Sequence, residues 1–230
     1  TFEKSDAWRA AFIESIRGTL AGDRGVGTFG GSEDHTAMLC SRPGLVTQFA
    51  YCPVRLERTI RLPGDYAFGV AVSGVAAEKT GEAMEKYNAA SRLASDLVER
   101  WRRETGRSDP HLAAVLASSP DAAARLRKVI APAGITGPES SSLLARLQHF
   151  MAESEEILPA AGDCLAQGDV LGFGHWVSRS QQAAEELLGN QIPETSLLAS
   201  SARDCGAVAA SAFGAGFGGS VWALVEKPRI

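Results

Sequence analysis

The spacing of apolar side chains predicts where the elements of this chain lie. In residues 5–20, large apolar side chains recur at every fourth position from Trp8 to Leu20, which predicts an amphipathic helix with Ser5 as its capping residue. Stretches that follow are rich in valine and in aromatic and alternating residues, and this pattern is typical of strands. We expect three consecutive strands at residues 45–51, 54–62 and 66–73.

Helical periodicity dominates the second half of the chain. A long helix is predicted at residues 78–105, short helices and turns at 110–138, and further helices at 140–165, 169–188 and 194–205. Residues 207–225 have the pattern of a strand, a glycine loop and a second strand. Strands mixed with grouped helices, without regular alternation, predict an α+β fold.

Charge and composition exclude some partners. The 230 residues hold 23 Lys and Arg against 27 Asp and Glu, a net charge of −4, so we expect neither a nucleic acid nor an anionic membrane as partner. The sequence contains no apolar run of the roughly 18 to 20 residues that a membrane helix needs and no secretory signal, and we therefore expect a cytoplasmic protein.

Cysteine and histidine spacing predicts no metal site. The cysteines are scattered without a C-x-x-C pair, so we expect reduced, mostly buried thiols. His111, His149 and His175 lie on predicted helices without ligand spacing, which is typical of surface or capping residues.

Two glycine-rich loops, at residues 25–35 and 214–219, are candidate sites of chemistry. Glycines let backbone N–H groups approach an anion closely, although a tight turn is the commoner role of such a loop. The first loop ends in Glu33-Asp34-His35, and a carboxylate there could accept a proton from a substrate hydroxyl. Alternatively, Asp34 caps a short segment that begins at His35.

These loops carry a resemblance to a known family. Gly30-Gly31-Ser32-Glu33-Asp34-His35 resembles the Gly-Ile-Met-Asp-Gln loop of galactokinases, and residues 214–220 resemble the third glycine motif of that family, within the wider GHMP kinase superfamily. Between them, Lys86-Tyr87-Asn88 and residues 165–173 resemble further family motifs in the same order.

The resemblance implies an ATP-dependent sugar kinase that phosphorylates an anomeric hydroxyl to give a sugar 1-phosphate. It implies that Asp34 is the base or charge partner of the accepting hydroxyl and that Tyr87 hydrogen-bonds the sugar. It also implies that Gly30 and Gly31 line the sugar pocket and that His35 contacts the substrate. The residues that would close the site beside sugar and ATP phosphates are Gly214, Ala215, Gly216, Phe217, Gly218 and Gly219.

The matched motifs belong to the C-terminal part of that family. Its first sugar motif and its phosphate loop would lie upstream of Thr1, so we expect the missing N-terminal part, or a second chain, to complete the site and to hold most ligands of Mg²⁺. The resemblance implies a mixed or antiparallel sheet with a cluster of helices on one side. It divides the chain into the end of an N-terminal lobe, residues 1–75, and a C-terminal domain, residues 76–230.

Departures from the family pattern leave the sugar and the activity open. Ser32 and Glu33 stand where the family has an apolar pair, and His35 replaces a glutamine, so the resemblance does not fix galactose as the sugar. The same polar pair favours an alternative, a non-catalytic relative that senses a sugar or a nucleotide, whereas the presence of Asp34 and Tyr87 favours the enzyme. A third alternative is a structural domain that mediates dimerisation.

Overall fold

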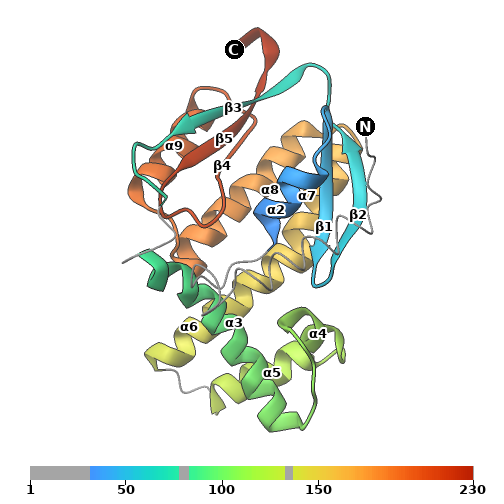
Figure 1. Cartoon of the computed structure of the whole chain (residues 1–230), viewed down its shortest axis with the longest axis vertical. Coiled ribbons are helices and arrows are strands. Elements are labelled where there is room, and N and C mark those ends of the chain that lie inside the picture. The colour runs from blue at the N-terminus through green and yellow to red at the C-terminus, as the bar shows by residue number, and fades with distance from the viewer. Residues whose placement is uncertain (1–31, 78–82, 133–136, 230) are drawn as a thin grey trace.

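The computed structural model describes residues 32–77, 83–132 and 137–229 of the chain (Figure 1). The predicted helix at residues 5–20 and the first part of the glycine loop at 25–35 lie outside the described residues, and so do Gly30 and Gly31.

The strands form two separate antiparallel sheets. β1 (Leu45–Tyr51) and β2 (Val54–Arg61) make a hairpin, and a second sheet has the order β3-β5-β4, from Tyr66–Val72, Ser220–Glu226 and Ala209–Ala212. The predicted strands are confirmed to within a residue at their ends. β3 nevertheless pairs with β5 near the C-terminus and not with the hairpin that precedes it.

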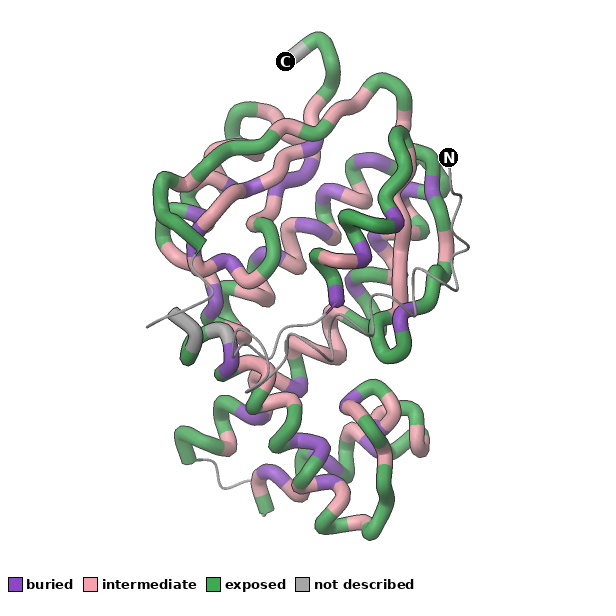
Figure 2. The backbone as a smooth tube through the Cα atoms, viewed as in Figure 1, coloured by how far each residue is buried: buried purple, intermediate pink, exposed green. Residues whose placement is uncertain are grey.

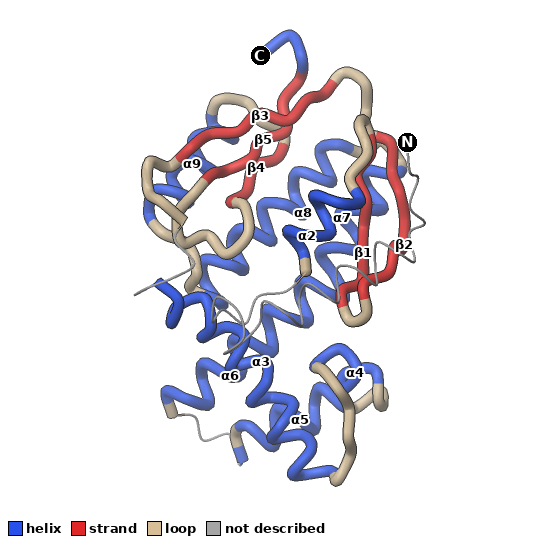
Figure 3. Tube along the Cα trace, in the orientation of Figure 1, coloured by secondary structure: helices blue, strands red, loops and turns tan. Residues whose placement is uncertain are grey.

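Helices make up most of the remaining described chain (Figure 3). They are α2 (Glu33–Cys40), α3 (Ala83–Thr105), α4 (Leu112–Ala117), α5 (Ala122–Ile130), α6 (Pro138–Met151), α7 (Leu158–Ala166), α8 (Val170–Ala183) and α9 (Pro193–Asp204). A π-helical turn, η3 (Ala152–Ile157), joins α6 to α7, and another, η4 (Ala184–Leu188), follows α8. The predicted helices at 140–165, 169–188 and 194–205 are thus confirmed, the first two with a widened turn inside them.

The core of α3 to α6 is built around Trp101. This side chain is fully buried among leucines such as Leu97, Leu126 and Leu147, and its indole Nε1 donates to Asp109 Oδ2 at 2.8 Å. Figure 2 shows buried positions facing one another in this helical layer. Burial of large apolar side chains is the main source of stability here, and the hydrogen bond satisfies the polar edge of the indole.

The three-stranded sheet is covered by a helix on each face. Neighbouring residues of a strand point to opposite faces, so Ala209 packs with Leu224 against α8, whereas Ala210 packs with Val221 against α9. The expectation of helices on one side is therefore wrong for this sheet. On β3, alternate residues Phe68, Val70 and Val72 share a face and are 48%, 63% and 73% exposed.

The hairpin is tied to the helices by Arg58 of β2. Its guanidinium donates to Asp163 Oδ1 of α7 at 2.5 Å and to the Pro159 carbonyl at 2.7 Å. A Cβ atom at Gly162 would lie 2.0 Å from Arg58 Nη2, so only glycine admits this approach. At the other side of the hairpin, Cys40 of α2 packs on β1 and β2. Arg58 therefore fixes α2 to the body of the protein through the hairpin.

Strands from both predicted parts of the chain, residues 1–75 and 76–230, lie in one sheet. β3 lies before residue 75 and β5 after it, and the two strands are paired along their length. The division into residues 1–75 and 76–230 stays a prediction.

Exposure of the thiols differs in part from the sequence-based expectation. All cysteines are free, but Cys40 is buried and Cys164 half-buried, whereas Cys52 and Cys205 are exposed. The expectation of mostly buried thiols is therefore wrong for Cys52 and Cys205. Within the described residues, no helix is long and apolar enough to cross a membrane.

His149 on α6 is expected to make folding sensitive to acid. Burial, and then the neighbouring Arg146, lower the pKa of His149 from 6.5 to about 4. The folded protein thus binds this proton less readily than the unfolded chain, so the contribution of neutral His149 is complete above pH 6.5 and is lost as the pH falls toward 4. Because His149 is only half-buried, solvent screens part of this effect, and we expect the free energy of unfolding to fall by on the order of 1 kcal/mol between pH 7 and pH 5.

Urea denaturation at pH 7 and pH 5 gives the change in the free energy of unfolding between these pH values, for the wild type and for His149→Gln. The contribution of His149 is the difference between the two changes. Equal changes in the two proteins would show that the fold does not hold His149 in its neutral form.

Candidate functional site

The glycine loop between β4 and β5, residues 214–219, adopts a backbone that other residues rarely adopt. Gly214, Gly216, Gly218 and Gly219 have φ angles of 57°, 76°, 136° and 82°. Left-handed values of this kind are unfavourable for residues with a Cβ atom. The glycines that the sequence places here are therefore required by the shape of the loop.

The segment after β3 holds one side of the loop. Ser73 N donates to the Gly219 carbonyl and Gly219 N donates to the Val75 carbonyl, both at 2.8 Å. At Gly218, a Cβ atom would lie 2.9 Å from the carbonyl oxygens of Val75 and Ala76, so a side chain cannot be accommodated without movement of the backbone.

Part of the loop backbone has no partner of its own. Among the residues that the structure describes, no acceptor lies within hydrogen-bonding distance of the amides of Gly214, Ala215, Gly216 and Gly218. Consecutive N–H groups in a tight loop of glycines form a concave surface that attracts anions. The loop therefore has the chemistry of a site for a phosphate or another anion.

Asp34 lies in the first turn of α2. The helix begins at Glu33, with Ser32 at its N-cap position, so Asp34 is not the capping residue and the end of the predicted loop is helical. Carboxylates are stabilised in this turn because the unpaired amides at a helix N-terminus carry partial positive charge. Asp34 is exposed, and its helix is held by packing of Cys40 against the hairpin.

Asp34 and the glycine loop line the same cavity, which has a volume of about 300 Å³. Figure 1 shows α2 beside the connection from β4 to β5. The described residues that line the cavity are Asp34, Val70, Ala77, Phe213, Gly214, Ala215, Gly216, Gly218, Gly219 and Ser220. The structure thus brings together the two motifs that the sequence singled out, although they lie near opposite ends of the chain.

Tyr51, at the end of β1, is a neighbour of the α2 carboxylates that sequence reasoning missed. Burial, and then the charges of Glu33, Asp34 and Cys40, raise the pKa of Tyr51 to about 12. Its hydroxyl therefore keeps its proton at neutral pH and can act as a donor. Nothing in the strand pattern distinguishes this tyrosine, because only the pairing of the hairpin brings it to α2.

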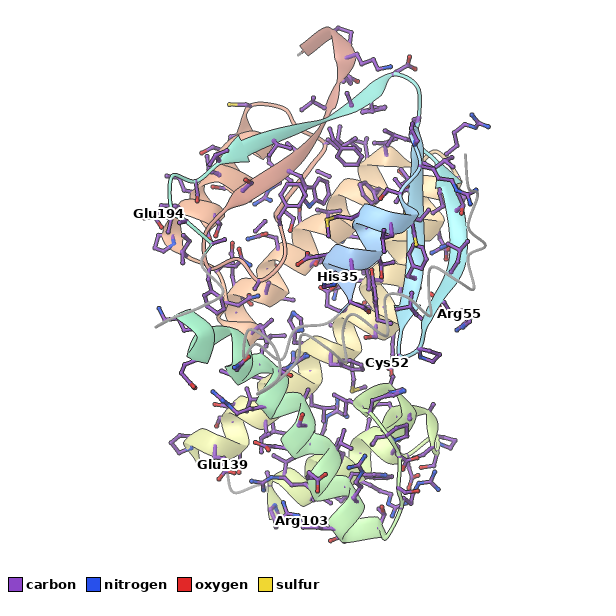
Figure 4. All side chains as sticks on the ribbon, viewed as in Figure 1. His35, Cys52, Arg55, Arg103, Glu139 and Glu194 are labelled. Carbon is purple, nitrogen blue, oxygen red and sulfur yellow. The ribbon has the colours of Figure 1, made fainter. Side chains whose placement is uncertain are left out.

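The other predicted site residues have varied positions. His35 is half-buried on α2, where its Nδ1 atom is buried and has no hydrogen-bond partner in the part of the chain that the structure describes (Figure 4). It is not among the described residues that line the cavity. Phe217 is also outside that set, although it belongs to the loop. Tyr87 lies on α3, but its side chain, like Gly30 and Gly31, is outside the described part of the structure.

No group of three or more His, Cys, Asp or Glu side chains within the described ranges is placed to hold a metal ion. Of the histidines, His111 is a capping residue, because its Nδ1 atom accepts from the backbone N of Ala114 at the start of α4.

The fold is similar to that of a sugar kinase. No protein-family model matches the sequence, and no curated protein matches it. Among solved structures, the chain is similar to Lactococcus lactis galactokinase in complex with galactose, with a TM-score of 0.75 and 19% identical residues. The similarity covers 96% of this chain and 52% of that chain, so this chain spans about half the length of that galactokinase. The chain therefore has a galactokinase-like α+β fold.

Proposed function

We propose that this chain is the C-terminal part of a phosphotransferase that acts on a sugar. More specifically, it belongs to a galactokinase-like member of the GHMP kinase superfamily that converts MgATP and a monosaccharide into MgADP and a sugar 1-phosphate. The observation that carries the proposal is the shared cavity, which is lined by the carboxylate of Asp34 and by a glycine loop in which the amides of Gly214, Ala215, Gly216 and Gly218 have no partner among the described residues. The galactokinase-like fold supports the same conclusion.

In this proposal Asp34 acts on the accepting hydroxyl of the sugar. Its carboxylate accepts a hydrogen bond from the anomeric hydroxyl, orients it toward the phosphoryl group and takes up its proton as the new O–P bond forms. Tyr51 is protonated and uncharged at neutral pH, and its hydroxyl can donate a hydrogen bond near the α2 carboxylates, although Tyr51 is not among the described residues that line the cavity.

The glycine loop has the complementary role toward negative charge. Its free amides fit phosphate oxygens, and its lack of side chains lets a ligand approach the backbone. MgATP supplies the phosphoryl group when bound. The described residues fit the anionic and hydroxyl parts of such a ligand pair, whereas the phosphate loop and the ligands of Mg²⁺ belong in this proposal to the missing N-terminal part or to a second chain.

The test uses the complete protein, including the part upstream of Thr1. We expect ADP to form from ATP only when the right member of a panel of free monosaccharides is added, and we expect this chain alone to show no turnover. Formation of a sugar 1-phosphate, detected by ³¹P NMR, identifies the position of transfer.

A non-catalytic sensor is the alternative. The polar Ser32 and Glu33 in place of an apolar pair favour it, and Ser32 is buried with a hydroxyl that has no hydrogen-bond partner among the described residues. Saturable binding of a sugar or of ATP by the complete protein, without ADP formation for any sugar of the panel, would establish the sensor and exclude the kinase.

A further inference from the structure

Gln181 on α8 is a buried polar residue directly behind the glycine loop. It is 2% exposed, and its side-chain amide is fully used. The Oε1 atom accepts from Ser211 Oγ at 2.9 Å and from Ala212 N at 3.0 Å, and the Nε2 atom donates to Glu185 at 2.8 Å and to Gln191 at 3.3 Å.

The bond to Ala212 N closes an open sheet edge at the root of the loop. β4 is the edge strand of the sheet that the described residues form, so its outward amides have no strand to pair with there. Gln181 supplies the missing acceptor at Ala212, the last residue of β4, and Phe213 then donates to the Ser220 carbonyl at 2.9 Å. The start of the loop is thereby held at a defined position on α8.

The bond to Gln191 reaches the middle of the loop. A Cβ atom at Gly216 would lie 2.1 Å from Gln191 Nε2, so the side chain of Gln191 packs directly on this glycine. The Gly216 carbonyl accepts from Ile192 N at 3.2 Å. The Thr195 hydroxyl, which is 0% exposed, has one proton to donate, and three acceptors lie within its reach: the Ile192 carbonyl at 2.9 Å, Gln191 Oε1 at 3.1 Å and the Gly216 carbonyl at 3.3 Å.

These contacts turn one peptide of the loop in a fixed direction. The Gly216 carbonyl is directed toward the start of α9, and because C=O and N–H point in opposite directions in a trans peptide, the N–H of Phe217 is directed away from α9. A carbonyl drawn back in this way leaves less negative charge facing an anion in the cavity.

We propose that Gln181 is a positioning residue that preorganises the glycine loop (residues 214–219) for a phosphate-bearing ligand, by fixing Ala212 at its root and Gln191 behind Gly216. This inference rests on the proposed function for the identity of the ligand, but the preorganisation itself is a property of the free protein. Preorganised backbone donors do not lose conformational freedom when the ligand binds, which increases affinity.

The chain offers a matched pair of substitutions. Gln181→Met keeps the length of the side chain but leaves Ser211 and Ala212 N without their acceptor. Gln182→Met makes the same change one residue later, where the exposed glutamine bonds, within the described part of the chain, only to Glu186 of the adjoining η4, at 2.8 Å.

The first readout is hydrogen–deuterium exchange of the complete protein without ligand. We expect the amides of Phe213 and Gly219, which bond to loop neighbours and not to Gln181, to exchange at least tenfold faster in Gln181→Met. In Gln182→Met, the loop amides should exchange at rates within twofold of the wild type. The amides of α3, α4 and α5 should also stay within twofold in both variants. Exchange of the loop within twofold of the wild type in folded Gln181→Met would overturn the proposal.

A second pair keeps the test decisive if Gln181→Met does not fold. Thr195→Val keeps the shape but removes the hydroxyl that lies between the carbonyls of Ile192 and Gly216 and Gln191 Oε1, and Thr195→Ser restores it. We expect the loop to exchange at least tenfold faster with valine and to return to within twofold of the wild type with serine. Equal loop exchange in the two variants would contradict the role of this network.

Binding of MgADP, measured by calorimetry on the complete protein, shows whether Gln181 positions the loop for a ligand or only packs behind it. We expect the Kd for MgADP to rise about tenfold in fully folded Gln181→Met and to stay unchanged in Gln182→Met. Faster exchange with an unchanged Kd would overturn the positioning role. If the complete wild type binds no MgADP, the proposed function fails, and the exchange data alone decide whether Gln181 orders the loop.

Discussion

Replacing Asp34 by Asn in the complete protein is expected to lower kcat for sugar phosphorylation by about a thousandfold, because a positioned acid–base group contributes on the order of 10² to 10⁴ in rate. The amide cannot take up the proton of the accepting hydroxyl and carries no charge to orient it. Asp34 lies on the cavity wall opposite the glycine loop, so the Kd for MgATP should change by less than threefold. Steady-state kinetics with ADP detection and equilibrium binding of ATP measure the two effects.

The neighbouring carboxylate provides the control for charge. Glu33→Gln makes the same change in the same helical turn, but Glu33 is not among the described residues that line the cavity. We expect this variant to keep kcat within threefold of the wild type. Turnover of Asp34→Asn at the wild-type rate would refute the role of Asp34, and an equal loss in both variants would show that the total charge of α2 matters and not the position of one carboxylate.

Replacing Gly218 by Ala is expected to lower kcat/KM about a hundredfold. The residue has a φ angle of 136°, which a residue with a Cβ atom adopts only with strain of about 1 to 3 kcal/mol. The new methyl group would also lie 2.9 Å from the carbonyl oxygens of Val75 and Ala76, which are backbone atoms and cannot rotate away. The loop must leave its conformation, and about 2.7 kcal/mol of lost transition-state stabilisation corresponds to a hundredfold loss of rate.

Gly214→Ala is the matched variant in the same loop. Its φ angle of 57° is an ordinary left-handed value, and no atom lies within 4 Å of the position of a new Cβ atom. We expect about a fivefold loss or less, from the roughly 1 kcal/mol that this conformation costs alanine. Similar losses at both glycines would show that the contact with the segment after β3 is not what shapes the site, and an unaffected Gly218→Ala would separate the loop from function altogether.

Local pattern was enough to predict most elements of the fold, whereas long-range pairing was not. Alternation of side chains located β3 to within one residue, but its partner β5 lies near the other end of the chain, and no local signal encodes that pairing. For the same reason, the sequence did not predict helices on both faces of the sheet. Ala209 and Ala210 are the same residue type, and only their alternation in β4 directs one toward α8 and the other toward α9.

Of the candidate site, too, the sequence predicted some residues and not others. Asp34 and the glycine loop could be found from the sequence because their residue types carry the chemistry. Tyr51 and Gln181 could not, because each acquires its place only through packing, one beside α2 and the other behind the loop. The start of α2 at Glu33 was also missed, since the glycines before it favour a loop and the helix is stabilised by its contact with the hairpin.

The central position of β5 has a consequence for the order of events during synthesis. Among the described strands, β3 and β4 each pair with β5 alone, and β5 comes later in the sequence than either of them. The helical layer around Trp101 can fold while the chain is still growing, but the wall of the cavity that the glycine loop forms cannot close until residues 220–226 have emerged. During that interval β3 has no partner strand among the described residues, so its backbone N–H and C=O groups are open to pairing with other chains.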